Sequence, residues 1–310
     1  MPDDSGRMAA FTGAPRLEEI ADGVHAFLQP DGGWCLNNAG LVVDGGTALL
    51  IDTAATEARA RRLRELVAGT APQLPRLLVN THSHGDHSFG NHLFPEAVVV
   101  AAERTRQEAI RTGLHLTSLW PDVDWGAVEP AAPQVTFAGE LTLHIGEQEV
   151  LLRAFGPAHS SCDTVAWLPQ RRVLFAGDLV MNAVTPFVLT GSVSGLRDAV
   201  ARLRALDAAT VVPGHGPVGG PELLDTTERY LAWLLDLAKA GLAEGLDPLE
   251  AARAADLGEF ADYLDTERLV PNLYRAYGEL RGGRPEDFAG IDEMVRGMAE
   301  LHGGFPACHA

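Results

Sequence analysis

The segment from His82 to His87 carries three imidazoles and one carboxylate in six positions, directly after the apolar run Leu77–Val79. Imidazole and carboxylate groups are the side chains that hold zinc or iron at neutral pH. On an extended chain, side chains two positions apart point to the same side, so His82 and His84 form one cluster. Asp86 and His87 fall where the chain turns and form a second cluster. The loop therefore predicts a metal site, and the two clusters favour two ions.

Three later segments each place one ligand-type side chain in a glycine-bearing loop beside an apolar run. These segments are Gly156–His159, Leu174–Asp178 and Val211–Gly216. Taken alone, each is weak, since such residues are common in turns and on surfaces. As an ordered set they are strong, and each reads as a strand that ends at one common edge.

This set, a HxHxDH loop followed by single His, Asp and His residues, resembles the metallo-β-lactamase fold superfamily of hydrolases over residues 15 to 220. The run Leu49–Thr53 is similar to an early strand of that family and contains Asp52. The resemblance implies an αββα sandwich with two metal ions. It assigns the first ion to His82, His84 and His159, the second to Asp86, His87 and His215, and the bridging position to Asp178.

The charge balance argues against nucleic acid as a partner. The chain has 24 basic and 42 acidic residues and a net charge of -18, which repels a phosphate backbone. The basic stretch Arg59–Arg64 reads as the solvated face of a helix. No apolar run reaches the ~18 residues of a membrane span, and no signal peptide is visible, so we expect a cytoplasmic protein.

Cysteine usage predicts no disulfide framework, because Cys35, Cys162 and Cys308 are odd in number and far apart. We expect free thiols and rate Cys162 as structural.

The order of elements is typical of an α/β fold with two similar halves. Apolar runs between residues 16 and 53 read as strands, residues 56–68 as a helix, and the same logic returns between residues 135 and 212. We predict a disordered segment over residues 1–15, a catalytic domain over 16–220, a packed helical extension over 221–303 and a tail over 304–310. The extension is open to three roles: a cover for the sandwich, a wall of the cleft, or a homodimer contact.

Two zinc ions, with iron or manganese as alternatives, would lower the pKa of a shared water and let a bridging hydroxide attack a carbonyl. Asp86 is the candidate catalytic residue, which orients the nucleophile and passes its proton to the leaving group. Asp52 and Asp163 are candidates for holding the ligand histidines through hydrogen bonds.

Three segments are expected to set specificity: residues 29–38, 114–125 and 181–194. They are apolar or aromatic, which suits an acyl or aromatic small molecule. The candidate pocket residues are Trp34, Asn37, Trp120, Trp125 and Phe187.

Ligand identity separates the possible reactions. The acid at Asp178 argues against an antibiotic-degrading lactamase, because the resemblance implies that those enzymes lack it. Residues 29–38 and 269–275 look similar to stretches of thioesterase/cyclases from aromatic polyketide pathways, which implies release of a polyketide from an acyl carrier protein.

We therefore predict a dizinc thioesterase, with a lactonase or esterase as runner-up. A mononuclear iron persulfide dioxygenase is the alternative from another class. A metal scaffold without activity is disfavoured, because the ligand set is complete.

Overall fold

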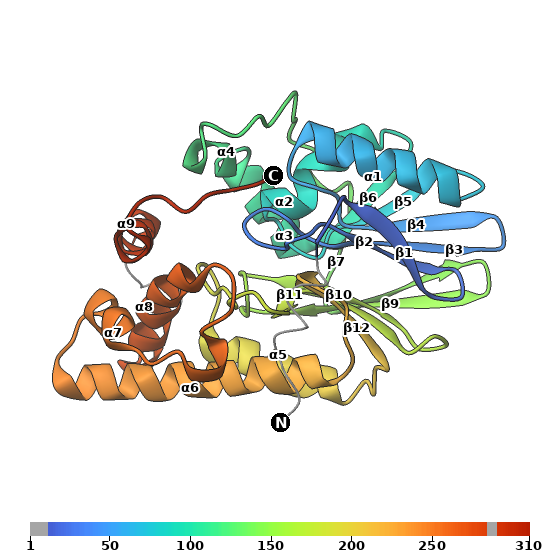
Figure 1. Cartoon of the computed structure of the whole chain (residues 1–310). Coiled ribbons are helices and arrows are strands. Elements are labelled where there is room, and N and C mark those ends of the chain that lie inside the picture. Colours follow the sequence, from blue (N-terminus) through green and yellow to red (C-terminus); the bar gives the residue numbers. More distant parts are fainter. Residues whose placement is uncertain (1–11, 284–289) are drawn as a thin grey trace.

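The structure, a computed structural model, describes residues 12–283 and 290–310. Its strands form two sheets that pack face to face, with helices outside both sheets (Figure 1). The predicted αββα sandwich with a C-terminal helical extension is confirmed. Residues 1–11, most of the segment predicted to be disordered, lie outside the described residues.

The first sheet has seven strands in chain order, antiparallel from β1 to β4 and parallel from β4 to β7. The strands are β1 (Arg16–Ala21), β2 (Val24–Leu28), β3 (Ala39–Asp44), β4 (Thr47–Ile51), β5 (Leu77–Val79), β6 (Val98–Ala102) and β7 (Val135–Phe137). Parallel neighbours need a crossover. Helix α1 (Glu57–Thr70) supplies it between β4 and β5, and the Thr56 hydroxyl caps this helix by accepting from the Arg59 N–H.

The second sheet has five strands in the order β12, β11, β10, β9, β8, and its only parallel pair is β11 with β12. The strands are β8 (Glu140–Ile145), β9 (Gln148–Phe155), β10 (Asp163–Leu168), β11 (Val173–Met181) and β12 (Thr210–His215). Helix α5 (Val193–Arg204) is the crossover for the parallel pair. All nine residues of β11 are buried, because sheet and helices cover both of its faces.

One core lies between the two sheets. Alternate residues of β2, β3 and β4, such as Val24, Val42 and Leu49, meet Val150, Phe175 and Val212 from the second sheet. At Gly40, an added Cβ would lie 2.4 Å from the Phe175 ring. The sheets are therefore in direct contact, and the strand ends of both sheets are held in fixed relative positions.

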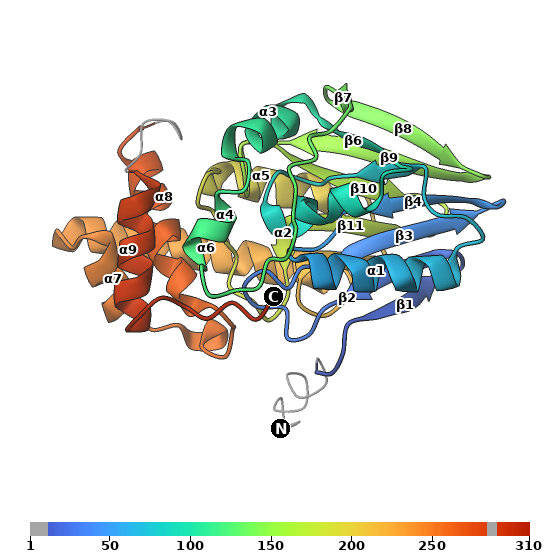
Figure 2. The same ribbon diagram turned by 90° about the horizontal axis from the view of Figure 1, so that it is seen from above.

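The remaining described helices lie beneath the second sheet, beside α5, or gather toward one end of the sandwich (Figure 1 and Figure 2). They are α2 (Gly85–Ser88), η3 (Phe89–Leu93), α3 (Glu103–Thr112), α4 (Leu116–Leu119), α6 (Glu222–Glu244), α7 (Pro248–Ala254), η4 (Gly258–Phe260), η5 (Thr266–Arg268), α8 (Leu269–Leu280) and α9 (Ile291–His302). Helix α6 ends at Gly245, which has φ 75°. None of the described helices is long and apolar enough to cross a membrane.

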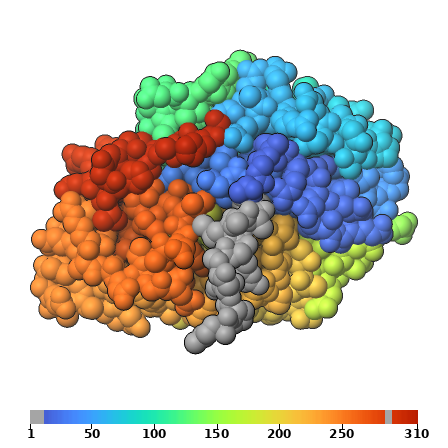
Figure 3. All heavy atoms as spheres, viewed as in Figure 1, coloured from blue at the N-terminus to red at the C-terminus, as the bar shows by residue number. Residues whose placement is uncertain are grey.

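The C-terminal helices share a core with the second sheet. Leu231 and Leu234 of α6 and Leu273 of α8 pack in one cluster with Leu174 of β11 and Val200 of α5. After α9 the chain runs back across the sandwich toward the first sheet, as the red segment of Figure 3 shows. There the Trp120 indole donates to the Pro306 carbonyl at 2.7 Å.

Candidate dinuclear metal centre

The seven predicted ligand residues lie together at one edge of the sandwich. All but Asp178, which lies within β11, follow or end a strand. His82 and His84 lie on the loop after β5, Asp86 and His87 in α2, His159 on the loop after β9, Asp178 in β11, and His215 at the end of β12. Both sheets therefore contribute to one site.

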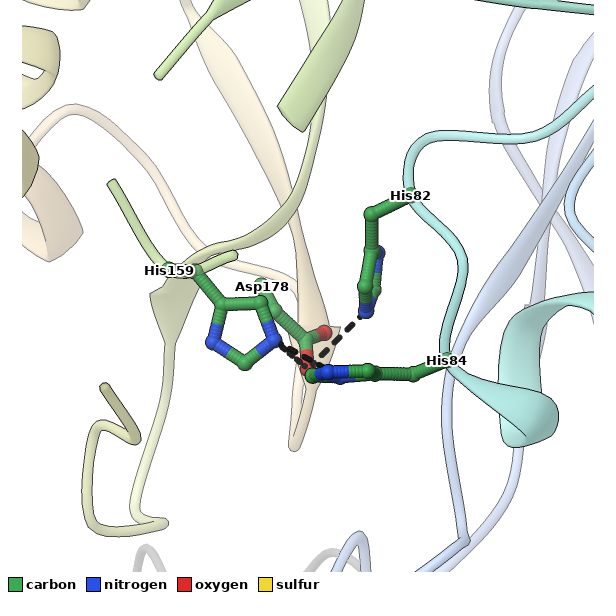
Figure 4. Close-up of side chains that lie close together, drawn as sticks. All are labelled: His82, His84, His159 and Asp178. Carbon is green, nitrogen blue, oxygen red and sulfur yellow. Dashed lines mark hydrogen bonds and ion pairs between the residues drawn. The ribbon is translucent and has the colours of Figure 1, made fainter. Parts of the chain in front are cut away.

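The first group consists of His82, His84, His159 and Asp178, whose ligand atoms all lie within 4.8 Å of one another. Figure 4 shows these side chains pointing toward one centre. Nε2 of His159 lies 3.0 Å from Nδ1 of His84 and 3.3 Å from Oδ2 of Asp178. Three imidazoles and one carboxylate at this spacing form a donor set that suits zinc.

The second group consists of Asp86, His87 and His215, whose ligand atoms also lie within 4.8 Å of one another. Nε2 of His215 is 3.2 Å from Oδ2 of Asp86. Asp178 reaches this group as well, since its Oδ1 lies 3.1 Å from Nε2 of His87. The two oxygens of Asp178 thus face the two groups, as a bridging carboxylate requires.

Four of the five histidines have a fixed partner on Nδ1, which leaves Nε2 for the centre. The partners are the Thr81 hydroxyl for His82 at 3.0 Å, Asp52 for His87 at 2.8 Å, the Phe187 carbonyl for His159 at 2.5 Å and the Gly32 carbonyl for His215 at 3.0 Å. Such partners fix the tautomer and orientation of a metal-binding ring. Asp52 takes the predicted supporting position, and it also accepts from the Thr81 N–H and hydroxyl.

The residues fit a bound metal on two observations. Nε2 of His82 is buried and makes no hydrogen bond to any described residue, although a buried polar atom normally has a partner. Burial lowers the pKa of His82, of His84, and of His159, the last to about 3, so that these rings are neutral at physiological pH. Neutral imidazole is the form that binds metal.

The second group is more highly charged. Burial disfavours charge on His87, but Asp178, Asp52 and Asp86 outweigh it and hold the pKa of His87 well above its ordinary value. Burial likewise opposes the charge of Asp86, but the His87 cation and a hydrogen bond from His215 lower the pKa of Asp86 to about 2. Asp86 is therefore ionised throughout the neutral range.

Gly214 leaves the space that Asp178 occupies. A Cβ at Gly214 would lie 1.8 Å from Oδ1 of Asp178 and 2.8 Å from its backbone nitrogen. Only glycine allows the parallel strands β11 and β12 to hold the carboxylate in this place. The sequence offered the signal in the run Pro213-Gly214-His215.

Three predicted residues lie elsewhere. Asp163 makes no hydrogen bond to a ligand ring among the described residues; it accepts from the N–H and hydroxyl of Ser160 and from the backbone of His159, and so holds the turn at His159. Asn37 is fully buried and donates to the Thr53 carbonyl, which supports the loop beneath the site. Trp125 packs against Phe89 and donates to the Trp120 carbonyl. Asn37 and Trp125 are absent from the described residues that line the cavity beside the metal groups.

A cavity of about 140 Å³ opens onto the centre. His84, Asp86, Asp178 and His215 form its polar floor. The other walls are mainly apolar and include residues from all three segments expected to set specificity, with Trp34, Trp120 and Phe187 among them. Trp34 lies 5.3 Å from Trp120 and 5.2 Å from Phe187 between ring centroids.

The helical extension forms part of the wall of this cavity. Of the three roles that the sequence left open for the extension, the structure shows this one. Ile291, Val295 and Met298 of α9 line it, at the regular spacing of one helix face. Arg268 also lines it, and its Cζ lies 4.0 Å from the Trp34 ring centroid. The acid beside it, Glu267, accepts from the Trp34 indole at 2.6 Å. The sequence shows the helical periodicity of α9, but it does not show which surface this helix packs against.

Comparison with known proteins agrees with this geometry. Residues 32–215 match the family described as the metallo-beta-lactamase superfamily. The chain is 29% identical over 277 residues to the 2,4-dinitroanisole O-demethylase subunit alpha of Nocardioides sp. (strain JS1661), covering 86% of this chain and 75% of that protein. It is 25% identical to the metallo-beta-lactamase type 2 of Bacteroides fragilis, covering 69% of this chain and 84% of that protein.

A solved structure of the metallo-beta-lactamase from Pontibacter korlensis superposes with a TM-score of 0.57 and 26% identity. The superposition covers 70% of this chain and 99% of that one. Since the family match spans more than half of the residues and carries all seven ligand positions, the chain belongs to the metallo-β-lactamase superfamily.

Proposed function

We propose that the protein is a dizinc hydrolase that cleaves thioesters, and in second place oxygen esters or lactones, of small apolar or aromatic acids. The observation that carries this proposal is the mainly apolar, aromatic-walled cavity whose polar floor consists of four of the seven predicted ligand residues. Such a cavity places an acyl or aryl group by burial and leaves its carbonyl at the carboxylate and imidazole groups. When bound, the two ions would supply Lewis acidity for the carbonyl and a water of lowered pKa.

The place of Asp86 in the predicted ligand set supports a substrate with a good leaving group. A carboxylate must be deprotonated to bind a metal, whereas a general acid works best when its pKa is close to the working pH. Asp86 therefore orients a water as an acceptor but carries a proton only briefly. A thiolate or phenolate, with a parent pKa of about 8.5 to 10, leaves without prior protonation, whereas an alkoxide or amine does not. This favours thioesters and aryl esters over alkyl esters and amides.

The cavity volume also bears on substrate size. The cavity of about 140 Å³ suits a compact acyl or aryl group, and α9 lines part of its wall. We therefore propose a small acid rather than a folded polyketide. Presentation by an acyl carrier protein and a cyclase step remain predictions.

A second candidate reaction, cleavage of an activated aryl methyl ether, rests on one comparison. The match to the 2,4-dinitroanisole O-demethylase subunit alpha covers 86% of the chain, so it extends past residue 215 into the helical extension. The region of similarity therefore includes part of the helical extension as well as the residues matched by the family.

The test is a substrate panel on the full chain loaded separately with zinc, manganese and iron. The panel contains an S-phenyl thioester, the matched phenyl and ethyl esters, a lactone, a cephalosporin and 2,4-dinitroanisole. We expect two zincs per chain and kcat/KM values for the thioester and phenyl ester at least ~100-fold above that of the ethyl ester.

Equal rates for ethyl and phenyl esters would overturn the leaving-group argument. Selective turnover of 2,4-dinitroanisole would promote the second candidate. A single iron, with oxygen uptake on a persulfide and no hydrolysis, would replace the proposal by a dioxygenase.

A further inference from the structure

The segment from Thr185 to Ser194 links β11 to α5 and passes directly behind the first metal group. Its Phe187 carbonyl accepts from Nδ1 of His159 at 2.5 Å, and this bond directs Nε2 of His159 toward Asp178 (Figure 4). The residues that hold the Phe187 carbonyl in place therefore also affect the orientation of His159.

One face of α8 is bonded along this segment. Positions 268, 272, 275 and 279 follow the spacing of four, three and four that aligns side chains on one helix face, and Arg268 already has helical dihedral angles. Each residue bonds the backbone of the segment: Arg268 to the Thr185 carbonyl at 3.2 Å, Asn272 to Pro186 and Val188, Arg275 to the Leu189 carbonyl at 2.6 Å, and Glu279 to the N–H groups of Val193 and Ser194 at 2.6 and 3.0 Å.

Asn272 is the member of this face that bonds the peptide unit containing the Phe187 carbonyl. It is fully buried, its Oδ1 accepts from the Val188 N–H at 2.8 Å, and its Nδ2 donates to the Pro186 carbonyl at 2.7 Å. The Val188 N–H and the Phe187 carbonyl belong to the same planar peptide unit and point in opposite directions. Asn272 therefore holds one side of the peptide whose other side holds His159.

We infer that Asn272 is a positioning residue for the metal centre: through the peptide between Phe187 and Val188 it sets the tautomer and orientation of His159. The helical extension is then part of the metal site as well as a wall of the cavity. This inference rests on the proposed function only in taking His159 as a ligand. Loss of a group that orients a ligand histidine typically costs 10- to 100-fold in metal affinity.

Two variants separate this role from ordinary packing. Asn272→Leu keeps the branched shape of the side chain but removes both backbone hydrogen bonds together with the bond to Tyr230. Tyr230→Phe is the matched control, because the Tyr230 hydroxyl accepts from the same Nδ2 at 2.9 Å and its loss leaves the bonds to Pro186 and Val188 intact. We expect zinc affinity, measured by competition with a chelator, to fall 10- to 100-fold in Asn272→Leu and to change less than ~3-fold in Tyr230→Phe.

A second measurement reads the tautomer of His159 directly and needs neither activity nor bound metal. Ring-nitrogen NMR shifts of metal-free protein, assigned with His159→Gln, should show His159 as the Nδ1–H tautomer, since the Phe187 carbonyl can only accept. Asn272→Leu should populate both tautomers, and Tyr230→Phe should match the wild type.

An Nε2–H tautomer in the wild type would overturn the inference, as would a folded Asn272→Leu protein that binds zinc as tightly as Tyr230→Phe. If the wild type binds no zinc at all, the proposed function fails, and the ring-nitrogen shifts still decide the inference.

Discussion

The side chains of the metal groups come from strand ends and short loops of both sheets, whereas the wall opposite them comes from long loops and from α9. The first region is built from buried charges, such as Asp178 between His87 and His159. The second is built from apolar surfaces such as Met298 and Trp120. The comparison indicates that reaction type and substrate choice are encoded in separate parts of the chain and are open to separate tests.

The largest expected effect is on the reaction itself. Asp86→Asn keeps the size of the side chain but removes the negative charge that orients the water. We expect kcat to fall about 10²- to 10⁴-fold, the range typical of a lost acid–base group. Steady-state kinetics on protein with a measured zinc content is the check, and a variant with two zincs and normal turnover would contradict the role.

Metal removal tests how far the charged region depends on its ions. A ligand that binds only the folded state at a concentration 1,000-fold above its Kd adds about 4 kcal/mol of stability. We therefore expect chelation to lower Tm by several degrees or more, and the Tm to rise with free zinc in a stepwise titration. Asp178→Asn should flatten that dependence, and a wild-type Tm that is indifferent to free zinc would count against the site.

Asp163, in the turn next to His159, should make the free energy of unfolding depend on pH. Burial raises the pKa of this carboxyl to about 7, against the opposing hydrogen bonds from Ser160. A carboxyl with a raised folded-state pKa stabilises the fold fully below its ordinary value of 3.8, and this contribution is lost as the pH rises through 7.

We expect chelated wild type to lose up to about 4 kcal/mol relative to Asp163→Asn between pH 4 and pH 8, measured by denaturant unfolding. Asp122→Asn, at an exposed acid, is the control and should parallel the wild type. Parallel curves for Asp163→Asn would show that this carboxyl titrates normally.

The smallest expected effect concerns the apolar wall. Met298→Ala enlarges the cavity next to the α9 face and should shift preference toward longer acyl groups by about 10- to 100-fold in kcat/KM, with kcat on the smallest thioester nearly unchanged. Arg296→Ala, on the exposed face of the same helix, is the matched control. A uniform loss over all acyl lengths would mean that α9 serves the reaction rather than the selection of substrates.

The metal region was predictable because its signal is local. The HxHxDH loop, the single ligands after apolar runs and Asp52 are all readable as residue types beside strand patterns, and the structure brings them together. The wall was only partly predictable. Trp34, Trp120 and Phe187 line the cavity, but Asn37 and Trp125 do not, since a side chain on a long loop has no periodicity to fix its direction.

The supporting residues were out of reach of the sequence for a different reason. The bonds of Asn272 and Arg268 reach backbone groups more than 80 positions away, and nothing in the local pattern of α8 marks those partners.

The close approach of Gly214 to Asp178 also bears on how this protein changes over generations. Every amino-acid substitution at position 214 adds a Cβ where the carboxylate and backbone of Asp178 already lie. A single substitution of Gly214 would therefore displace Asp178 from the metal groups. Ile291, Val295 and Met298 are less restricted, because their side chains line the cavity. Descendants of this chain are thus free to acquire new substrates by mutation in one helix, while steric exclusion holds the reaction constant.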